Sequence, residues 1–216
     1  WMLIIFDCDG VLVDSELMAN HILAEYLTEL GFPHTRKECT EKYVGRSISS
    51  IMGMIEDKMD CNLPKNFRAE LMERDKSSFK DQLQAIPGVA EVIVSWAGPK
   101  CVASSSSLER IYNSLKITGL LTYFEPYVFS ACQVASGKPD PALFQFASEQ
   151  MKVSAADCLV VEDSVPGVIS GKRAGMRVMG FVGGSHCGPG HDKKLLDAGA
   201  DQVFDNMIDL KNEIKG

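Results

Sequence analysis

The chain has 216 residues, 45% of them hydrophobic and 24% charged, which is ordinary for a globular protein of one domain or of one domain with a smaller addition. Its 22 basic and 29 acidic residues give a net charge of −7, which argues against nucleic acid and membrane surfaces as partners. No apolar run reaches the length of a membrane span and we expect no signal peptide, while seven scattered cysteines predict reduced thiols and a cytoplasmic location.

The first predicted element is a buried parallel strand over residues 3–6, where four apolar residues are followed by Asp and Gly. Asp7 and Asp9 come next, two positions apart, so in an extended segment their side chains share a face while Cys8 points away. Two carboxylates so close repel each other unless a proton or a cation lies between them. Mg²⁺ is the simplest cation for such oxygen ligands, although a strand followed by a plain Asp-Gly turn is the alternative.

Residues 15–82 carry only helical signals, and no convincing strand lies among them. Helices are predicted over residues 17–30, 36–43, 47–59 and 64–79. Gly31 ends the first of these helices, and Ser47 is the expected N-cap of the third. Several methionines in this region would allow a cofactor box, but helix–helix packing explains them better.

Helices and strands alternate in the second part of the chain. Strands are predicted over residues 101–103, 127–129, 158–161, 177–182 and 202–204, and helices over residues 89–96, 107–115, 140–151 and 165–174. The helix over 107–115 is expected to turn a basic and polar face outwards, and Asp140 to cap the helix that Pro141 opens. Strict alternation implies right-handed crossovers and a doubly wound parallel sheet.

The predicted fold class is therefore α/β with an insertion. Residues 1–14 and 83–216 are expected to form the parallel-sheet core, which carries the chemistry. Residues 15–82 are expected to form a helical cap inserted after the first strand, since only helices are predicted there.

A glycine-rich stretch over residues 183–191 is the nearest thing to a flexible segment. It contains His186, Cys187 and His191, three residue types that bind metals. The density of glycine and proline favours a plain surface loop, and the metal-binding alternative stays open at this point.

Polar residues follow three more of the predicted strands. Ser104 lies at a strand-to-helix junction, where free backbone N–H groups attract anions, and Lys138 lies in a tight turn before a helix. Glu162 and Asp163 follow the clearest late strand. Singly, each has a plainer explanation: a helix cap for Ser104 or Asp163, and a solvated side chain for Lys138. Together with Asp7, at one edge of a parallel sheet, they predict a Mg²⁺-dependent phosphoryl-transfer site.

Each of these residues has an expected role in such a site. Asp7 would be the nucleophile, as carboxylates are in aspartyl-phosphate chemistry. Asp9, whose side chain is not needed by the metal, is expected to have a raised pKa, to protonate the leaving alcohol and later to take a proton from water. Ser104 and Lys138 would bind phosphate oxygens.

The segment DCDGVLVDS at residues 7–15 resembles the first motif of the haloacid dehalogenase superfamily of phosphatases, in the β-phosphoglucomutase-like subgroup with an α-helical cap. Ser104, Lys138 within Gly-Lys-Pro-Asp-Pro, and the segment 162–164 resemble the second, third and fourth motifs. The resemblance spans the chain and implies a Rossmann-like core with an inserted cap that closes over the substrate.

The resemblance also implies a set of metal ligands. Mg²⁺ would be held by Asp7, the backbone oxygen of Asp9 and Asp163, with Glu162 close by or direct. The presence of Asp9 argues against the dehalogenases, which lack this second aspartate and need no metal. The Schiff-base lysine of the phosphonatases is not identified.

A β-phosphoglucomutase is the main alternative to a phosphatase. Its cap histidine would fall at Ala19, and His21 lies on another helix face, so hydrolysis is favoured. The expected substrate is a small phosphorylated metabolite, best a sugar phosphate similar to 6-phosphogluconate. A non-catalytic sensor of phosphorylated metabolites is the alternative of another class. The candidate substrate contacts are Ser105, Arg46, Ser47, Arg74 and Lys76.

Overall fold

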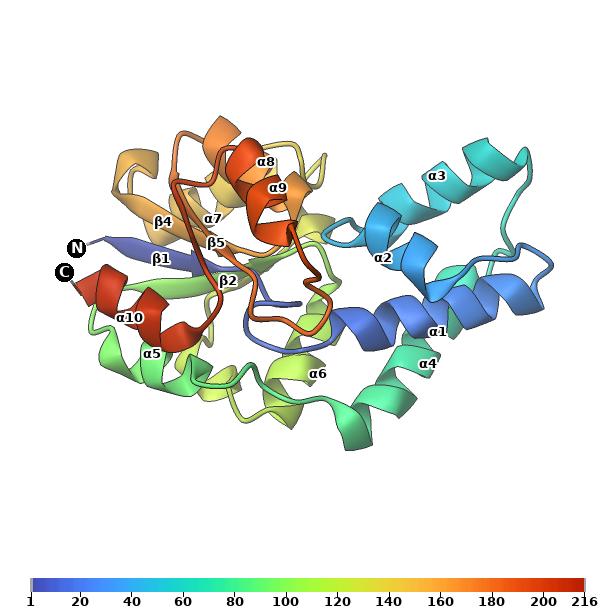
Figure 1. Cartoon of the computed structure of the whole chain (residues 1–216), viewed down its shortest axis with the longest axis horizontal. Coiled ribbons are helices and arrows are strands. Elements are labelled where there is room, and N and C mark those ends of the chain that lie inside the picture. Colours follow the sequence, from blue (N-terminus) through green and yellow to red (C-terminus); the bar gives the residue numbers. More distant parts are fainter. Residues whose placement is uncertain (1, 216) are drawn as a thin grey trace.

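The computed structural model describes residues 2–215 and has a six-stranded sheet at its centre (Figure 1). All strand pairs are parallel, and the order across the sheet is β3-β2-β1-β4-β5-β6. The strands are β1 (Leu3–Phe6), β2 (Lys100–Ser104), β3 (Val128–Ser130), β4 (Cys158–Glu162), β5 (Arg177–Phe181) and β6 (Gln202–Phe204). Strands β2 and β3 follow β1 on one side, whereas β4, β5 and β6 lie on its other side. Folds of this type bind ligands in the crevice at such a change of side.

Helices cover both faces of this sheet. One face packs against α5 (Val89–Ser95), α6 (Leu108–Ile117) and α10 (Met207–Lys215). The other packs against α7 (Ala142–Met151), α8 (Val165–Arg173) and α9 (His191–Asp197). This three-layer arrangement confirms the predicted doubly wound α/β fold.

Strand β1 shows why a continuous apolar run forms a central strand. Ile4 and Phe6 belong to one hydrophobic cluster, whereas Leu3 and Ile5 belong to the cluster on the opposite face. All four side chains are fully buried, because successive residues of a strand point to opposite faces and helices cover both.

Four helices are inserted between β1 and α5: α1 (Glu16–Glu29), α2 (Arg36–Tyr43), α3 (Ile48–Met59) and α4 (Phe67–Gln82). They extend from one end of the sheet in Figure 1 and have a hydrophobic cluster of their own. Two segments connect the insert to the sheet, and hydrogen bonds join them to each other. Asp14 N donates to Gln84 O at 2.9 Å, and Ile86 N donates to Leu12 O at 2.9 Å. The division into residues 15–82 and the rest stays a prediction.

The element predictions differ from the structure in a few places. The N-cap of α7 is Pro141 rather than Asp140, although the Asp140 carboxylate still accepts a hydrogen bond from Ala142 N at 2.9 Å. Helices α9 and α10 were not expected from the pattern. α9 has only seven residues and begins after a glycine, so the glycine-rich stretch before it hides the helical signal.

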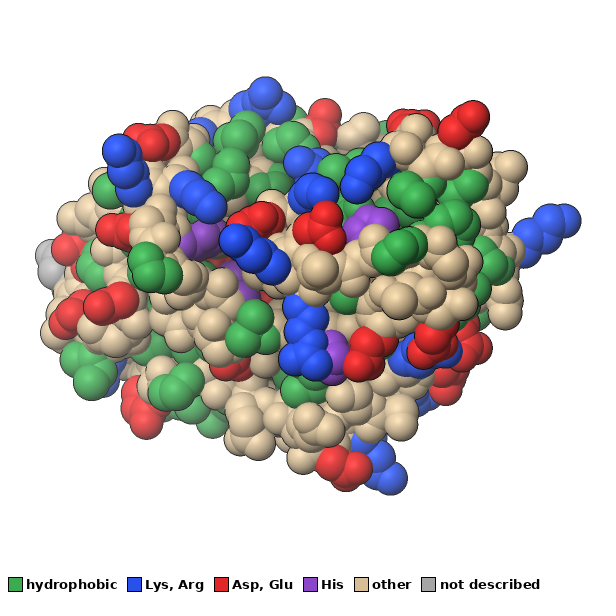
Figure 2. Space-filling model, turned by 45° about the vertical axis from the view of Figure 1, so that its right-hand side comes forward, with side chains coloured by type: hydrophobic (Ala, Val, Ile, Leu, Met, Phe, Trp, Pro, Cys, Tyr) green, Lys and Arg blue, Asp and Glu red, His purple; other side chains and the backbone are tan. Residues whose placement is uncertain are grey.

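The surface agrees with the composition. Figure 2 shows basic and acidic side chains interspersed on one face of the molecule, together with scattered hydrophobic ones. Within residues 2–215, none of the helices is both long and apolar enough to cross a bilayer.

Candidate active site

The carboxyl ends of the central strands bring the predicted residues together. Asp7 follows β1, Ser104 ends β2, and Glu162 and Asp163 end and follow β4. Lys138 enters from the turn before α7. None of these five residues is more than 3% exposed, so the site is a buried polar and charged cluster beneath the helical insert.

Lys138 is the electrostatic centre of this cluster. Its Nζ atom lies 2.8 Å from Asp7 Oδ1 and 2.6 Å from Glu162 Oε1, and it also donates to the Ala103 carbonyl at 3.4 Å. Burial alone would lower the pKa of Lys138, but the two carboxylates outweigh it and raise the pKa. The lysine is therefore charged and fixed, not solvated.

Asp7 is held by this lysine at the end of β1. Burial raises the pKa of Asp7 well above its usual value, and the lysine opposes this effect. Glu162 has both oxygens occupied, Oε1 by Lys138 and Oε2 by the amide and hydroxyl of Ser164 at 2.7 and 2.9 Å. Glu162 thus orients Lys138 within the site.

Asp9 is surrounded by hydrogen-bond donors. Its Oδ1 accepts from Ser15 at 2.6 Å and from Arg110 at 3.2 Å, and its Oδ2 accepts from Ser106 at 2.7 Å and from Ser104 at 3.3 Å. Burial would raise the pKa of Asp9, but Arg110 and the hydroxyl groups together lower it below its usual value. The prediction of a raised Asp9 pKa is therefore wrong, because the sequence pattern does not show these donors.

Arg110 connects this aspartate to the helical insert. It lies in the first turn of α6 and pairs with Asp75 of α4 as well as with Asp9. The expectation that the helix turns its basic face outwards fails at this residue. Arg110 lies three residues after the N-cap Ser107, at the same sheet edge as Ser104, and that position is the signal that could have identified it.

The geometry of the acidic residues fits a divalent cation. One oxygen each from Asp7, Glu162 and Asp163 lie within 4.8 Å of one another. Both carboxylate oxygens of Asp163 are buried without a hydrogen bond of good geometry among the described residues, although His186 Nε2 pairs with Oδ2 at 2.8 Å. A buried carboxylate oxygen without a donor is costly, and a hard cation is a ligand that would satisfy it.

The backbone at Gly10 keeps this place open. Its φ is +84°, and a Cβ atom there would lie 2.0 Å from Asp163 Oδ2. Only glycine tolerates both the backbone conformation and the close approach of the Asp163 carboxylate.

A pocket lies between this cluster and the helical insert. Three arginines reach it, Arg46 from the turn before α3, Arg68 from α4 and Arg110 from α6. Apolar side chains of the insert form much of the remaining wall, namely Leu23, Ile48, Ile51, Leu71 and Met72. The pocket therefore combines a cationic side, an acidic floor and an apolar wall.

The candidate substrate contacts divide into two groups. Ser105 and Arg46 line the pocket, and the Ser105 hydroxyl donates to the Gly45 carbonyl at 2.9 Å. Ser47 caps α3 by accepting from Ser50 N. Arg74 pairs with Glu29 and Glu70 on the surface of the insert, and Lys76 pairs with Glu109. Neither Arg74 nor Lys76 is among the residues that line this pocket.

Glu16 is a pocket residue that the motifs did not indicate. The residue is 8% exposed, and its carboxylate accepts a hydrogen bond from Asn20 at 3.0 Å. Burial, followed by the nearby Asp9 and Asp163, raises the pKa of Glu16 to about 8. Its place directly after the first motif, at the start of α1, is the signal that could have suggested it.

Comparison with known proteins places this geometry in a family. Residues 4–181 match the model of the haloacid dehalogenase-like hydrolases. The chain is 31% identical to the 6-phosphogluconate phosphatase of Escherichia coli, over 89% of this chain and 86% of that protein. It is 29% identical to the β-phosphoglucomutase of Bacillus subtilis, over 98% and 92% of the two chains. A haloacid dehalogenase-like protein of unknown function from Agrobacterium tumefaciens has a similar structure, with a TM-score of 0.83, 37% identity and coverage of 100% and 98%.

Proposed function

The chain belongs to the haloacid dehalogenase-like hydrolases, among their β-phosphoglucomutase-like members, and we propose that it is a Mg²⁺-dependent phosphatase of small sugar phosphates that acts through an aspartyl phosphate on Asp7. Its kinship with phosphatases makes it a phosphoric monoester hydrolase. The cation, the catalytic roles and the substrate are the proposed parts.

One observation carries the proposal. A buried lysine pairs with Asp7 at 2.8 Å, while Oδ1 of Asp163 beside it is buried and has no hydrogen-bond donor among the described residues. A charged lysine and an acidic pair at the carboxyl ends of parallel strands are what a doubly charged phosphoryl group and its counter-ion need. A plain structural ion pair would not leave an adjacent buried carboxylate oxygen without a donor.

Asp7, Asp163 and the backbone oxygen of Asp9 would hold the Mg²⁺, with Glu162 nearby as the partner of Lys138. When bound, the cation would neutralise these carboxylates and draw electron density from the phosphoryl group. Lys138 would bind one phosphoryl oxygen, and the Ser104 hydroxyl would donate to another.

The reaction would proceed in two steps on Asp7. In the first step, a carboxylate oxygen of Asp7 forms a bond to phosphorus as the bond from phosphorus to the substrate alcohol breaks. In the second step, water forms the new bond to phosphorus, and the bond to Asp7 breaks to release inorganic phosphate. Asp9 would give a proton to the departing alcohol and take one from the attacking water.

The contacts of Asp9 determine when it carries that proton. Arg110 and the hydroxyls of Ser15 and Ser106 favour its carboxylate form. An entering phosphate brings negative charge near Asp9, which raises its pKa and favours proton uptake. Substrate entry and protonation of Asp9 would thus be coupled.

The pocket supports a substrate with polar groups at both ends. Lys138 and Ser104 would hold the phosphoryl end, and Arg46 and Arg68 lie on the insert side of the pocket. A carboxylate at the far end of a phosphorylated sugar acid would suit these arginines. This is the substrate type that 6-phosphogluconate represents, and the similarity to its phosphatase supports the same choice. Closure of the insert, residues 15–82, would exclude water.

A sugar phosphomutase is the second candidate. The similarity to a β-phosphoglucomutase favours it, but the residue in the expected histidine position is Ala19, which lines the pocket. His21 instead contacts Glu25 and Arg36, at 3.1 and 2.8 Å, and is not among the pocket residues. Without a histidine there, hydrolysis is the better proposal.

Turnover of p-nitrophenyl phosphate and 6-phosphogluconate, measured with Mg²⁺ and with EDTA, tests the proposal. We expect phosphate release that EDTA abolishes and Mg²⁺ restores. Isomerisation of β-glucose 1-phosphate without phosphate release would support the mutase. Absence of turnover with a broad panel of phosphorylated sugars, despite binding, would support a non-catalytic sensor.

A further inference from the structure

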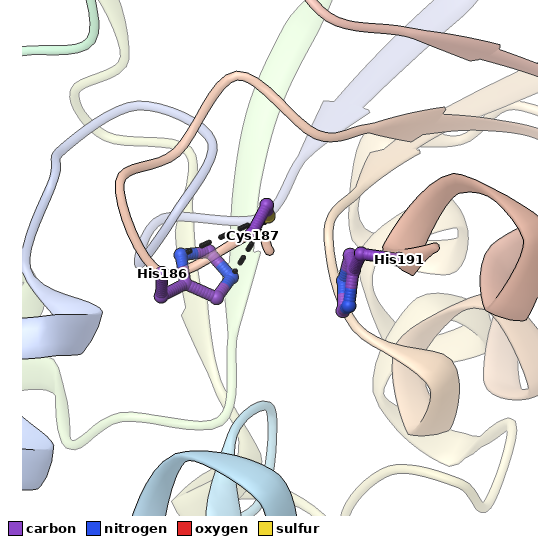
Figure 3. Close-up of side chains that lie close together, drawn as sticks. All are labelled: His186, Cys187 and His191. Carbon is purple, nitrogen blue, oxygen red and sulfur yellow. Dashed lines mark hydrogen bonds between the residues drawn. The ribbon is translucent and has the colours of Figure 1, made fainter. Parts of the chain in front are cut away.

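Beside the cluster at the strand ends, the loop between β5 and α9 and the first residue of α9 bring three metal-binding side chains together. Figure 3 shows Cys187 between the rings of His186 and His191. One donor atom from each residue lies within 4.8 Å of the other two. We infer that this loop is a second metal site, selective for a zinc-type transition metal, in which His186, Cys187 and His191 are the protein ligands.

The donor types argue for zinc rather than magnesium. Two imidazoles and a thiolate are the ligands of zinc sites, whereas magnesium takes oxygen ligands. Zinc distances of about 2.0–2.1 Å to nitrogen and 2.3 Å to sulfur place tetrahedral N and S ligands roughly 3.6 Å apart. Nδ1 of His186, the ring nitrogen that does not face Asp163, lies 3.9 Å from Cys187 Sγ, close to that separation.

A hydrogen bond orients His191 for this role, and an ion pair orients His186. Nε2 of His191 lies 2.6 Å from the backbone carbonyl oxygen of Asp163, so this nitrogen carries the proton and Nδ1 keeps its lone pair. Nε2 of His186 lies 2.8 Å from the Asp163 carboxylate, which leaves Nδ1 as the ligand atom. Metal-binding histidines almost always donate their second ring N–H to a carboxylate or a carbonyl in this way.

Cys187 provides the sulfur ligand of the proposed site. Cys187 Sγ lies within hydrogen-bonding reach of the His186 ring, 3.3 Å from Nε2, so the sulfur is held inside the cluster. The thiolate is the form that binds metals. This cysteine is also reduced and half-buried, so it is available to a cation from solvent.

The loop is shaped to hold the His186 ring. A Cβ atom on Gly184 would lie 2.8 Å from Cε1 and 2.9 Å from Nδ1 of His186, so only glycine lets the backbone pass at that distance. His186 and His191 line one surface groove, and Cys187 lines another. Water would be the fourth ligand, as in zinc sites with three protein ligands.

The site would be coupled to catalysis through one residue. Asp163 uses its carboxylate towards His186 and its carbonyl towards His191, and it also belongs to the acidic cluster with Asp7 and Glu162. A metal on the loop would fix both histidines and, through them, the orientation of Asp163. The inference does not depend on the proposed substrate or on phosphatase activity.

Cobalt(II) is the probe that tests the site, because a thiolate ligand gives cobalt an intense charge-transfer band in the near ultraviolet that oxygen ligands do not give. The full-length protein, stripped with chelator and held in excess Mg²⁺ to fill the carboxylate cluster, is titrated with Co²⁺. We expect one equivalent to bind with this band, and Zn²⁺ to displace it. Loss of a residue that only orients a ligand lowers the metal affinity of a site by about 10- to 100-fold. Loss of a ligand itself should lower the affinity at least as much.

Matched variants decide where the cobalt binds. Cys187→Ser should remove the thiolate band, and His191→Asn should weaken binding at least about 100-fold. Cys132→Ser, which removes an exposed thiol elsewhere, and Asp7→Asn, which alters the carboxylate cluster, should both keep the band. Circular dichroism establishes that each variant is folded. A folded wild type without a thiolate band, or a band that survives Cys187→Ser, would overturn the inference.

Discussion

The strand-end cluster and the outer face of the helical insert hold their charges in opposite ways. In the cluster, Lys138 and its two carboxylate partners are at most 5% exposed by side chain. On the insert, Arg74 and its partner Glu29 have side chains that are 32% and 56% exposed. Charges out of water must be fully paired or bind a ligand, whereas solvated pairs contribute little. We therefore expect substitutions in the buried cluster to change activity and stability more than substitutions in the exposed pairs of the insert.

The largest expected effect is at the nucleophile. Asp7→Asn keeps the shape of the side chain but replaces the nucleophilic carboxylate with a neutral amide, so we expect kcat to fall by about 10⁴-fold or more. Turnover of p-nitrophenyl phosphate measures this loss. Asp57→Asn, at an exposed position of the insert, is the control and should leave turnover unchanged. Appreciable activity in a folded Asp7→Asn protein would contradict the role of Asp7.

The next effect is on stability and sharpens the contrast between buried and exposed pairs. Lys138→Met leaves the buried Asp7 and Glu162 without their counter-charge, and we expect a loss of about 3–5 kcal/mol in the free energy of unfolding. Lys172→Met breaks the half-exposed pair with Asp201 and should cost at most about 1 kcal/mol. Urea denaturation of both variants measures the difference. Equal losses of unfolding free energy in the two variants would show that burial does not determine how much these ion pairs contribute to stability.

A third prediction concerns pH. The pKa of Glu16 is raised from 4.5 to about 8, chiefly by burial, so between these values the folded chain keeps a proton that the unfolded chain loses. This group therefore makes stability fall as pH rises from 4.5 to about 8. Glu16→Gln should flatten that fall, as measured by urea denaturation at several pH values. Glu149→Gln, on an exposed part of α7, should keep the wild-type slope, and a parallel pH dependence in both variants would contradict the prediction.

The smallest effect distinguishes two arginines of the insert. Arg46 lines the pocket, so Arg46→Met should raise KM for a phosphorylated sugar acid by roughly 10-fold, with kcat little changed. Arg74 pairs with Glu29 and Glu70 outside the pocket, so Arg74→Met should leave both constants within about twofold. Steady-state kinetics with 6-phosphogluconate measures the two. A larger change in KM for Arg74→Met than for Arg46→Met would support the prediction that Arg74 contacts the substrate.

The same contrast explains how far the sequence predicts the structure. The sheet could be predicted because each strand is a short apolar run that ends at a polar or glycine signal, and β1 shows this most clearly. The residues at the strand ends could be predicted because they need only the strand positions. The helices of the insert were also found, since α2 spans the predicted residues Arg36–Tyr43.

Packing across the chain is what the sequence could not show. Arg110 reaches Asp9 from 101 positions away and lowers its pKa, and this depends on how α6 docks on the sheet. Lys138 has the sequence context of a solvated turn residue, yet the fold buries it between two carboxylates. Local pattern therefore places the strands, whereas protonation depends on contacts that only the tertiary structure makes.

Chemical trapping of the intermediate tests the central claim most directly. The wild-type protein is mixed with Mg²⁺ and a substrate that it turns over, quenched with borohydride, digested and analysed by mass spectrometry. An acyl phosphate on Asp7 is reduced to an alcohol, so we predict that residue 7 is recovered as homoserine only when both substrate and Mg²⁺ are present. Rapid turnover that leaves Asp7 unmodified, or that marks another side chain instead, would contradict the account.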